Sequence, residues 1–324
     1  MVSEDVKVLY IAGTMRSGST LLARLLGELP QVVDVGELRL LFSPMFHDGS
    51  LCGCRETVPN CEFWRAVFER AFGGLSNLDR ESLCGTWQAY RPRALPRLLL
   101  ARASPLGRRR LREYAAALGA LYRAVRDLSG ARVLVDASKD PFYAYLLERT
   151  PGVDLRAVHL VRDSRAVAFS QKRVKSDPPE FPNPSRLPVV SPGRTALLWN
   201  AVNLLLTLKK VDGDSLLLRY EDLVADPEAA LERLGALMGE AALALDFLRA
   251  SPLSLSASHT VGGNPDRFKS QVTIRPDDEW RREMSPHDRR LVTTLTYPLL
   301  RRYGYLSSPP APEERARVRP AGVL

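Results

Sequence analysis

The segment from Val6 to Leu26 constrains the fold more than any other part of the chain. A β-branched, apolar run over Val6–Ala12 predicts a buried strand, and this run stops at Gly13. A turn rich in serine, threonine and glycine follows, and Leu21–Leu26 then has the apolar pattern of a helix. Such strand, loop and helix units are typical of phosphate binding, because backbone N–H groups and the helix N-terminus point at the anion.

Strands and helices continue to alternate along the chain. Further strands are expected at Arg132–Val135, Leu155–Val161 and Ser215–Arg219, each followed by a turn and a helical segment. Asp226 followed by Pro227 predicts the start of another helix. The pattern predicts an α/β fold with a P-loop-like parallel sheet flanked by helices, whose ligands bind at the carboxyl ends of the strands.

The expected organisation is a single domain over 1–308 and a tail at 309–324, whose proline and arginine content predicts disorder. A helical insertion is expected at about 62–130, where glycine and proline separate helical patterns. A loop at about 177–192 contains six prolines and is expected to be a lid or a wall of the acceptor site. The helical insertion is the other expected wall.

The formal net charge of +9 lies entirely between Gln88 and Arg132, where eleven arginines stand against two acids. A nucleic-acid-binding protein spreads its positive charge along several elements, so we expect no nucleic-acid partner. A non-catalytic nucleic-acid-binding protein that uses this segment remains an alternative. The arginines could also recruit an acidic acceptor or keep a helical face in water.

The sequence pattern contains no targeting or membrane signal. No apolar run approaches the roughly 18 residues of a membrane span, and Met1–Asp5 carries acids where a signal peptide carries bases. Four cysteines are too few for a disulfide scaffold in a chain of 324 residues. We therefore expect a soluble cytoplasmic protein, and the surplus of alanine, arginine, leucine and proline suggests GC-rich coding and a bacterial source.

The loop Gly13–Thr20 has the glycine spacing of a nucleotide-binding P-loop, but Ser19 stands where that loop needs lysine. Arg16 lies inside the loop instead. A P-loop kinase using ATP and Mg²⁺ remains an alternative, with partial support from Leu134–Asp136, which resembles the Mg²⁺-binding strand end of such enzymes. The segment could also be an ordinary turn between a strand and a helix.

Two motifs together resemble the PAPS-dependent sulfotransferase family, especially its carbohydrate and tyrosylprotein branch. Gly13–Leu22 is similar to the family's 5'-phosphosulfate loop, and His159–Ser170 is similar to its 3'-phosphate motif. The likeness extends over about residues 6–304. It implies transfer of a sulfuryl group from PAPS to a hydroxyl of a small-molecule, glycoside or lipid acceptor, with PAP as the product and no metal ion required.

The resemblance also implies a set of cofactor-binding residues. Arg162 and Ser170 would hold the 3'-phosphate, and Tyr220, in a segment similar to the family's Tyr-Glu-Asp-Leu strand, would lie near the adenine. The other implied contacts come from the first loop and from a C-terminal closing segment: Arg16, Ser17, Gly18, Ser19, Thr20, Leu21 and Ser270. Arg162 could instead form a surface ion pair with Asp163, and Tyr220 could be a core residue.

The resemblance implies a glutamate as the catalytic base. Cytosolic sulfotransferases use a histidine in the segment that here reads Asp136–Lys139, which contains none. In tyrosylprotein relatives, a glutamate about twenty residues after the arginine or lysine of the phosphosulfate loop serves as base. Here Glu37 lies twenty-one residues after Arg16. Glu37 is then the base, and Lys139 and Arg16 stabilise the transferred group. Alternatively, Glu37 is a solvated carboxylate paired with Arg39, and Lys139 is a surface lysine paired with Asp140.

The cysteines form a separate cluster in the sequence. Cys52, Cys54 and Cys61 could supply three zinc ligands, with His47 or Cys84 as the fourth. A single residue separates the first two cysteines, whereas zinc knuckles space theirs by about two to four residues. Buried thiols or a disulfide are therefore favoured over a metal site.

Overall fold

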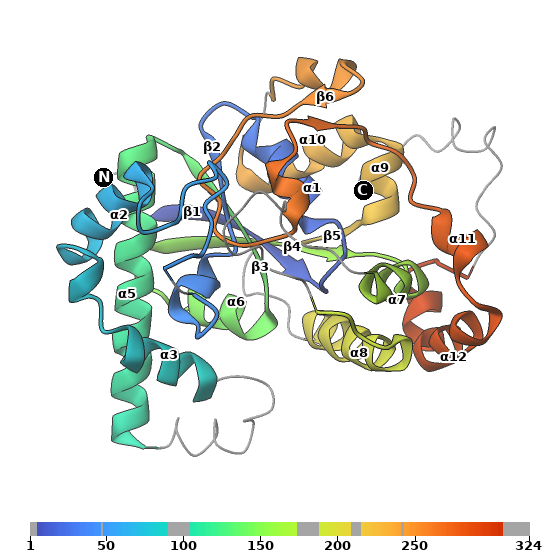
Figure 1. Ribbon diagram of the computed structural model, residues 1–324, viewed down its shortest axis with the longest axis horizontal. Coiled ribbons are helices and arrows are strands. Elements are labelled where there is room, and N and C mark those ends of the chain that lie inside the picture. Colours follow the sequence, from blue (N-terminus) through green and yellow to red (C-terminus); the bar gives the residue numbers. More distant parts are fainter. Residues whose placement is uncertain are drawn as a thin grey trace, which may run out of the picture.

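The computed structural model of the chain describes residues 5–46, 48–89, 104–173, 188–208, 215–240 and 243–306. At its centre is a five-stranded sheet in which all neighbouring strands are parallel, with helices on both faces (Figure 1). The α/β fold class is therefore confirmed. Across the sheet the order is β2 (Val32–Gly36), β3 (Val133–Lys139), β1 (Val6–Gly13), β4 (Val153–Val161) and β5 (Ser215–Arg219).

The helices cover the two faces of the sheet. The described α-helices are α1 (Ser19–Gly27), α2 (Glu62–Phe72), α3 (Arg80–Ala89), α5 (Pro105–Ser129), α6 (Pro141–Leu147), α7 (Ser164–Lys172), α8 (Pro192–Leu208), α9 (Tyr220–Ala225), α10 (Pro227–Met238), α11 (Glu279–Glu283) and α12 (Pro286–Arg302). Short 3-10 helices are η1 (Leu38–Phe42), η2 (Leu75–Asn77), η4 (Asp246–Arg249) and η5 (Pro265–Phe268). Strands β6 (Leu253–Ser254) and β7 (Gln271–Val272) form a small antiparallel ribbon.

Strand β1 lies in the middle of the core. Val8 and Tyr10 pack in one hydrophobic cluster with residues of α5 and α6, whereas Leu9 and Ile11 pack in another with residues of α1 and α10. All four side chains are fully buried. A strand covered on both faces needs apolar residues at successive positions, which explains the continuous apolar run in the sequence.

All four expected strands are present, and the one at Ser215–Arg219 has the expected bounds. The pattern does not predict β2, because Asp34 interrupts its apolar run. This carboxyl is tolerated in the buried strand since the Gly36 N–H donates a 2.9 Å hydrogen bond to it. The expected helix start after Asp226 is also present, because that side chain caps α10 by accepting from the N–H of Ala229.

The expected insertion at about 62–130 contains helices α2, α3, α5 and η2 in its described part. Of the proline-rich stretch at about 177–192, residues 177–187 lie outside the described residues, and α8 begins at the last residue, Pro192. The tail at 309–324 also lies outside them. Among the described helices, none combines the length and apolar character that a membrane crossing needs.

Candidate active site

Most of the predicted site residues follow the carboxyl ends of the parallel strands. These ends meet at one edge of a parallel sheet, where open α/β folds bind their ligands. The residues are the segment Thr14–Thr20 after β1, which includes the start of α1, Glu37 after β2, Lys139 at the end of β3, Arg162 after β4 and Tyr220 after β5. The sheet therefore brings together residues that lie far apart in the chain.

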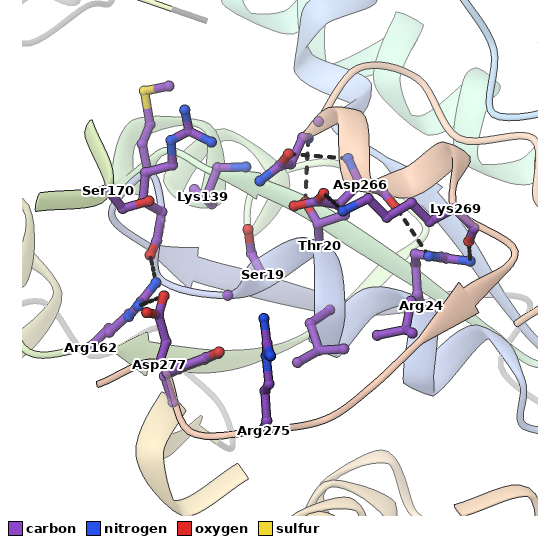
Figure 2. A pocket seen from close by; sticks show the side chains of 18 of the residues that line it. Ser19, Thr20, Arg24, Lys139, Arg162, Ser170, Asp266, Lys269, Arg275 and Asp277 are labelled. Carbon is purple, nitrogen blue, oxygen red and sulfur yellow. Dashed lines mark hydrogen bonds and ion pairs between the residues drawn. The ribbon is translucent and has the colours of Figure 1, made fainter. Parts of the chain in front are cut away.

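These residues line a cavity of about 560 Å³. Six cationic side chains and three carboxylates face it, which suits an anionic ligand. The cations are Arg16, Arg24, Lys139, Arg162, Lys269 and Arg275, and the carboxylates are Glu37, Asp266 and Asp277. In Figure 2, Ser19 from the start of α1 lies between Arg162 on one side and Arg24 on the other.

Gly18 allows the predicted phosphate loop to turn into α1. Its φ of 94° is left-handed, and a Cβ atom there would lie 2.3 Å from the Tyr220 ring. In the described structure no side chain caps α1, so its first backbone N–H groups remain available to an anion. Ser19, Thr20 and Leu21 line the cavity together with Gly18, whereas the side chain of Ser17 is buried and does not line it.

Arg16 is a cation without a partner at the cavity. Within the described part of the chain, neither of its terminal guanidinium nitrogens has a hydrogen-bond partner, and both are buried. Burial lowers the pKa of Arg16, and the charge of Arg162 lowers it further, while Asp266 acts in the opposite direction. A desolvated guanidinium of this kind attracts an anion that supplies the missing hydrogen bonds.

Glu37 is a buried carboxylate held between two cations. Its Oε1 lies 2.6 Å from Nζ of Lys139, and its Oε2 lies 3.2 Å from Nη2 of Arg39. Glu37 and Lys139 are each 8% exposed, so neither is the solvated surface residue that the sequence allowed as an alternative. Burial raises the pKa of Glu37, but the two cations outweigh that effect and the net pKa is lowered, which keeps the group ionised.

The backbone around Glu37 fixes its direction. Gly36 has a φ of 75°, and a Cβ atom there would lie 2.5 Å from the carbonyl oxygen of Val261. This close approach lets the N–H of Glu37 donate to the same carbonyl at 2.7 Å. Lys139 has a φ of 66°, and its Nζ also donates to the carbonyl of Ala137 at 2.8 Å. Glu37 and Lys139 therefore face each other with little freedom.

Arg162 joins several parts of the site. Its Nη1 donates to the carbonyl of Arg16 at 2.9 Å, and its Nη2 pairs with Asp277 at 2.5 Å. The guanidinium carbon lies 4.5 Å from the centre of the Tyr220 ring. The surface pair with Asp163 does not form, because Asp163 caps α7 and binds Arg165. Ser170 of α7 lines the cavity together with Arg162 (Figure 2).

Ser270 is not brought into the cavity, contrary to expectation. Its neighbours Lys269 and Gln271 line the cavity, but Ser270 is exposed and its carbonyl accepts from the N–H of Leu255. Neighbouring side chains of an extended segment point in different directions, so a shift of one residue in the alignment is enough to misplace the contact.

Two further cations at the C-terminal segment were not predicted from the sequence. Arg24 is 7% exposed, and its two terminal nitrogens donate to the carbonyls of Asp266 and Lys269 at 3.0 and 2.6 Å. These bonds hold the segment against α1. Arg275 reaches the cavity from the same segment (Figure 2). Only the basic last turn of α1 hinted at Arg24, and no local motif marked Arg275.

Asp136, in the segment that resembles a Mg²⁺-binding strand end, does not line the cavity. It is fully buried, and its carboxylate accepts hydrogen bonds from the hydroxyl of Tyr122 and, at 2.7 Å, from the N–H of Ser138. Burial raises its pKa to about 6. Its oxygens are thus engaged inside the core rather than presented to a nucleotide.

The described arginines of the Gln88–Arg132 stretch lie away from the cavity. No residue of α2, α3 or α5 in the described structure lines it, and α5 lies at the edge of the molecule (Figure 1). Arg109 pairs with Glu113 at 2.7 Å, and Arg126 pairs with Asp127 at 2.8 Å, both on α5. In the described residues, the expected acceptor wall from this insertion is not part of this cavity.

The three clustered cysteines meet a histidine that the sequence analysis did not connect to them. Cys52, Cys54 and Cys61 lie around His259, with all four ligand atoms within 4.8 Å of one another. Cys84 does not belong to this group, and His47 lies outside the described residues. All four cysteines of the chain are free, so the alternative of a disulfide is not observed.

Comparison with known proteins gives a family and several distant structures, including two sulfotransferase domains. The model of the Sulfotransferase family matches residues 9–242. The sulfotransferase domain from the Synechococcus PCC 7002 olefin synthase is 22% identical, with a TM-score of 0.42 over 90% of this chain and 94% of that domain. The sulfotransferase domain from the curacin biosynthetic pathway is 17% identical, with a TM-score of 0.45 over 89% and 96%. No curated protein matches the chain.

Proposed function

This chain belongs to the sulfotransferase family, whose model spans residues 9–242 of its 324, and from that membership we propose a specific reaction. We propose that the enzyme uses PAPS as the donor and sulfates a hydroxyl of a small-molecule, glycoside or lipid acceptor. The described residues fit such a donor, because the cavity combines the start of a helix with six cationic side chains. Two phosphate groups and a sulfate need this combination of charge and hydrogen-bond donors.

The observation that carries the proposal is the unpaired guanidinium of Arg16. Its terminal nitrogens are buried at the cavity without a partner in the described structure, while the neighbouring Arg162 is held by Asp277 and by the loop carbonyl. A free, desolvated guanidinium inside a phosphate-binding loop supports binding of the phosphosulfate end of the donor. Ser19 replaces the lysine of a P-loop kinase, which favours this donor over ATP.

Three residues would carry the chemistry. When bound, PAPS supplies a sulfuryl group: the acceptor oxygen bonds to sulfur, the bond from sulfur to the phosphate oxygen breaks, and PAP leaves. Glu37 accepts the proton of the acceptor hydroxyl, because its carboxylate is ionised and faces the cavity. Lys139 and Arg16 stabilise the charge that grows on the transferred group and on the leaving oxygen.

Arg162 and Ser170 would hold the 3'-phosphate. Asp277 neutralises Arg162 in this structure, and the carboxylate must give way to the phosphate. The Asp277 side chain is 40% exposed, whereas that of Arg162 is 7% exposed and is fixed by the carbonyl of Arg16. The acid is therefore the partner that moves. Tyr220 lies under the same guanidinium and offers its ring to the adenine.

The proposal is tested by transfer of labelled sulfate from PAPS to a panel of sugar, phenol, tyrosine-peptide and lipid hydroxyls. Product is expected with at least one class of acceptor. Calorimetry should also show that PAP binds more tightly than ATP with Mg²⁺. Tighter binding of ATP with Mg²⁺, combined with no transfer of sulfate, would favour the kinase and overturn the proposal.

A further inference from the structure

The cysteine cluster joins two segments that are distant in the sequence. Cys52 and Cys54 lie in the loop between η1 and α2, and Cys61 immediately precedes α2. His259 lies about 200 residues later, between β6 and η5. Neither segment belongs to the main sheet, and the cluster is where they meet.

Three of the distances between ligand atoms in the cluster are close to those of a tetrahedral metal site, and all four atoms lie within 4.8 Å of one another. Nδ1 of His259 lies 3.3 Å from Sγ of Cys61 and 3.7 Å from Sγ of Cys52. The Sγ atoms of Cys54 and Cys61 are 3.7 Å apart. A tetrahedral zinc ion with bonds of about 2.3 Å to sulfur and about 2.0 Å to nitrogen has edges of about 3.5–3.8 Å between ligand atoms. Sulfur atoms of a disulfide are about 2.05 Å apart, which is much closer.

Packing and hydrogen bonds around the cluster hold His259 in place and bring the two segments together. The His259 ring stacks on Phe63 at 4.8 Å between ring centres. The backbone carbonyl of His259 accepts from Nε1 of Trp64 at 2.9 Å. Gly53 separates the first two cysteines, and a Cβ atom there would lie 2.3 Å from the carbonyl oxygen of Ser258. The close approach of the two segments therefore leaves no room for a side chain between these two cysteines.

From this geometry we propose that Cys52, Cys54, Cys61 and His259 hold a structural zinc ion. Three thiolates and one imidazole form a ligand set that zinc takes in closed structural sites, where no position remains open for substrate. Binding displaces one proton from each thiol and leaves the imidazole neutral. The ion takes no part in sulfuryl transfer, so the proposed reaction still needs no metal.

The zinc ion stabilises the contact between two segments next to the cavity. The N–H of Gly53 donates to the carbonyl of Thr260 at 2.9 Å. In the next residue, the N–H of Val261 donates to the carbonyl of Val35 and the carbonyl of Val261 accepts from the N–H of Glu37. Gly263, two residues further on, lines the cavity. The metal therefore fastens the loop before α2 to the segment that supports Glu37.

The first experiment measures zinc in the full-length protein, purified under reducing conditions without chelator. We expect about one zinc per chain, and no loss of it in Cys84→Ser, which removes the cysteine outside the cluster. The variants Cys52→Ser, Cys61→Ser and His259→Ala should each lose most of the zinc. Full zinc content in these variants would overturn the proposal, and so would a wild-type protein that contains no zinc and takes up none when it is added.

A second measurement does not depend on whether the variants fold. Wild-type protein is stripped with a chelator, and Co²⁺ is then added as a spectroscopic probe. Thiolate-to-cobalt charge transfer and the visible bands of a tetrahedral ion are expected, and added Zn²⁺ should remove them. An octahedral cobalt spectrum, or a Cys54–Cys61 disulfide found by mass spectrometry in the untreated protein, would overturn the proposal. Neither readout depends on sulfotransferase activity, so this site and the proposed function can fail independently.

Discussion

At the scale of single residues, the state of Glu37 determines what the site can do. Moving a carboxylate out of water costs several kcal/mol, and here two cations within 3.2 Å offset that cost. The arrangement is a weak source of stability, but it holds an ionised oxygen at the cavity. The lowered pKa of Glu37 also means that the base stays available at pH values below the ordinary glutamate range.

Replacing Glu37 with glutamine tests its role as the base. The amide keeps the size of the side chain but cannot accept the proton, so sulfuryl transfer should fall by about 10²- to 10⁴-fold. Affinity for PAP should be retained, because the proposed role of Glu37 concerns the acceptor proton. Transfer rates and calorimetry measure the two quantities separately.

The control for this substitution is Glu232→Gln on the exposed side of α10, which should leave both quantities unchanged. If Glu37→Gln turned over at nearly the wild-type rate, another group would have to be the base. If it lost PAP affinity as well, the pair with Lys139 would be organising the donor site instead.

Arg162→Ala should weaken binding of PAP much more than binding of 5'-AMP. The two nucleotides differ by the 3'-phosphate, and a charged hydrogen-bond partner contributes about 1.5–3 kcal/mol, which corresponds to about 10- to 150-fold in affinity. Ser170→Ala should show the same selectivity with a smaller loss. Calorimetry with both nucleotides gives the comparison. An equal loss of affinity for the two nucleotides would mean that Arg162 acts by holding the loop in shape, through its hydrogen bond to the carbonyl of Arg16, and does not bind the 3'-phosphate.

At the scale of elements, the start of α1 depends on its contact with α9. The backbone of Gly18 lies so close to the Tyr220 ring that an added methyl group would have to displace the ring or the loop. Gly18→Ala should therefore lower PAP affinity by more than about tenfold and destabilise the fold by about 1–3 kcal/mol, since its φ of 94° also disfavours alanine. Calorimetry and chemical denaturation measure the two effects.

Gly85→Ala is the matched control for this prediction. Gly85 lies within α3, and a Cβ atom there would meet nothing within 4 Å. Alanine should stabilise that helix by up to about 1 kcal/mol and leave PAP binding unchanged. Wild-type PAP affinity in Gly18→Ala would show that the loop and the ring can separate without affecting the nucleotide.

The elements also show how far the sequence could predict the site. The loop after β1 and Arg162 after β4 belong to local motifs that follow strands, so the sequence pattern alone predicts both. Arg24 could not be found in this way, because its role depends on backbone carbonyls more than 240 residues away. His259 is separated from the cysteines by 198 residues or more, and only the folded chain brings it to them.

At the scale of the whole molecule, two buried acids should control how stability depends on pH. Burial raises the pKa of Asp34 to about 7 and that of Asp136 to about 6, both far above the ordinary value of 3.8. Between about pH 4 and 7, these two carboxyls therefore keep protons in the folded chain that they have already released in the unfolded chain. Because stability falls with pH wherever the folded state binds more protons, the free energy of unfolding should decrease as pH rises through this window.

Asp34→Asn should flatten this dependence. The amide oxygen can still accept from the N–H of Gly36 but never ionises, so the loss of stability from Asp34, on the order of 4 kcal/mol across the window, should disappear. Chemical denaturation at a series of pH values from 5 to 8 should give a shallower slope than wild type, with the largest gain at the alkaline end. The exposed variant Asp246→Asn should keep the wild-type slope. Parallel curves for wild type and Asp34→Asn would instead mean that Asp34 is ionised throughout this range. The charge of Arg24 lowers the pKa of Asp34 against the effect of burial, so Arg24 would then be the group that stabilises the carboxylate inside the sheet.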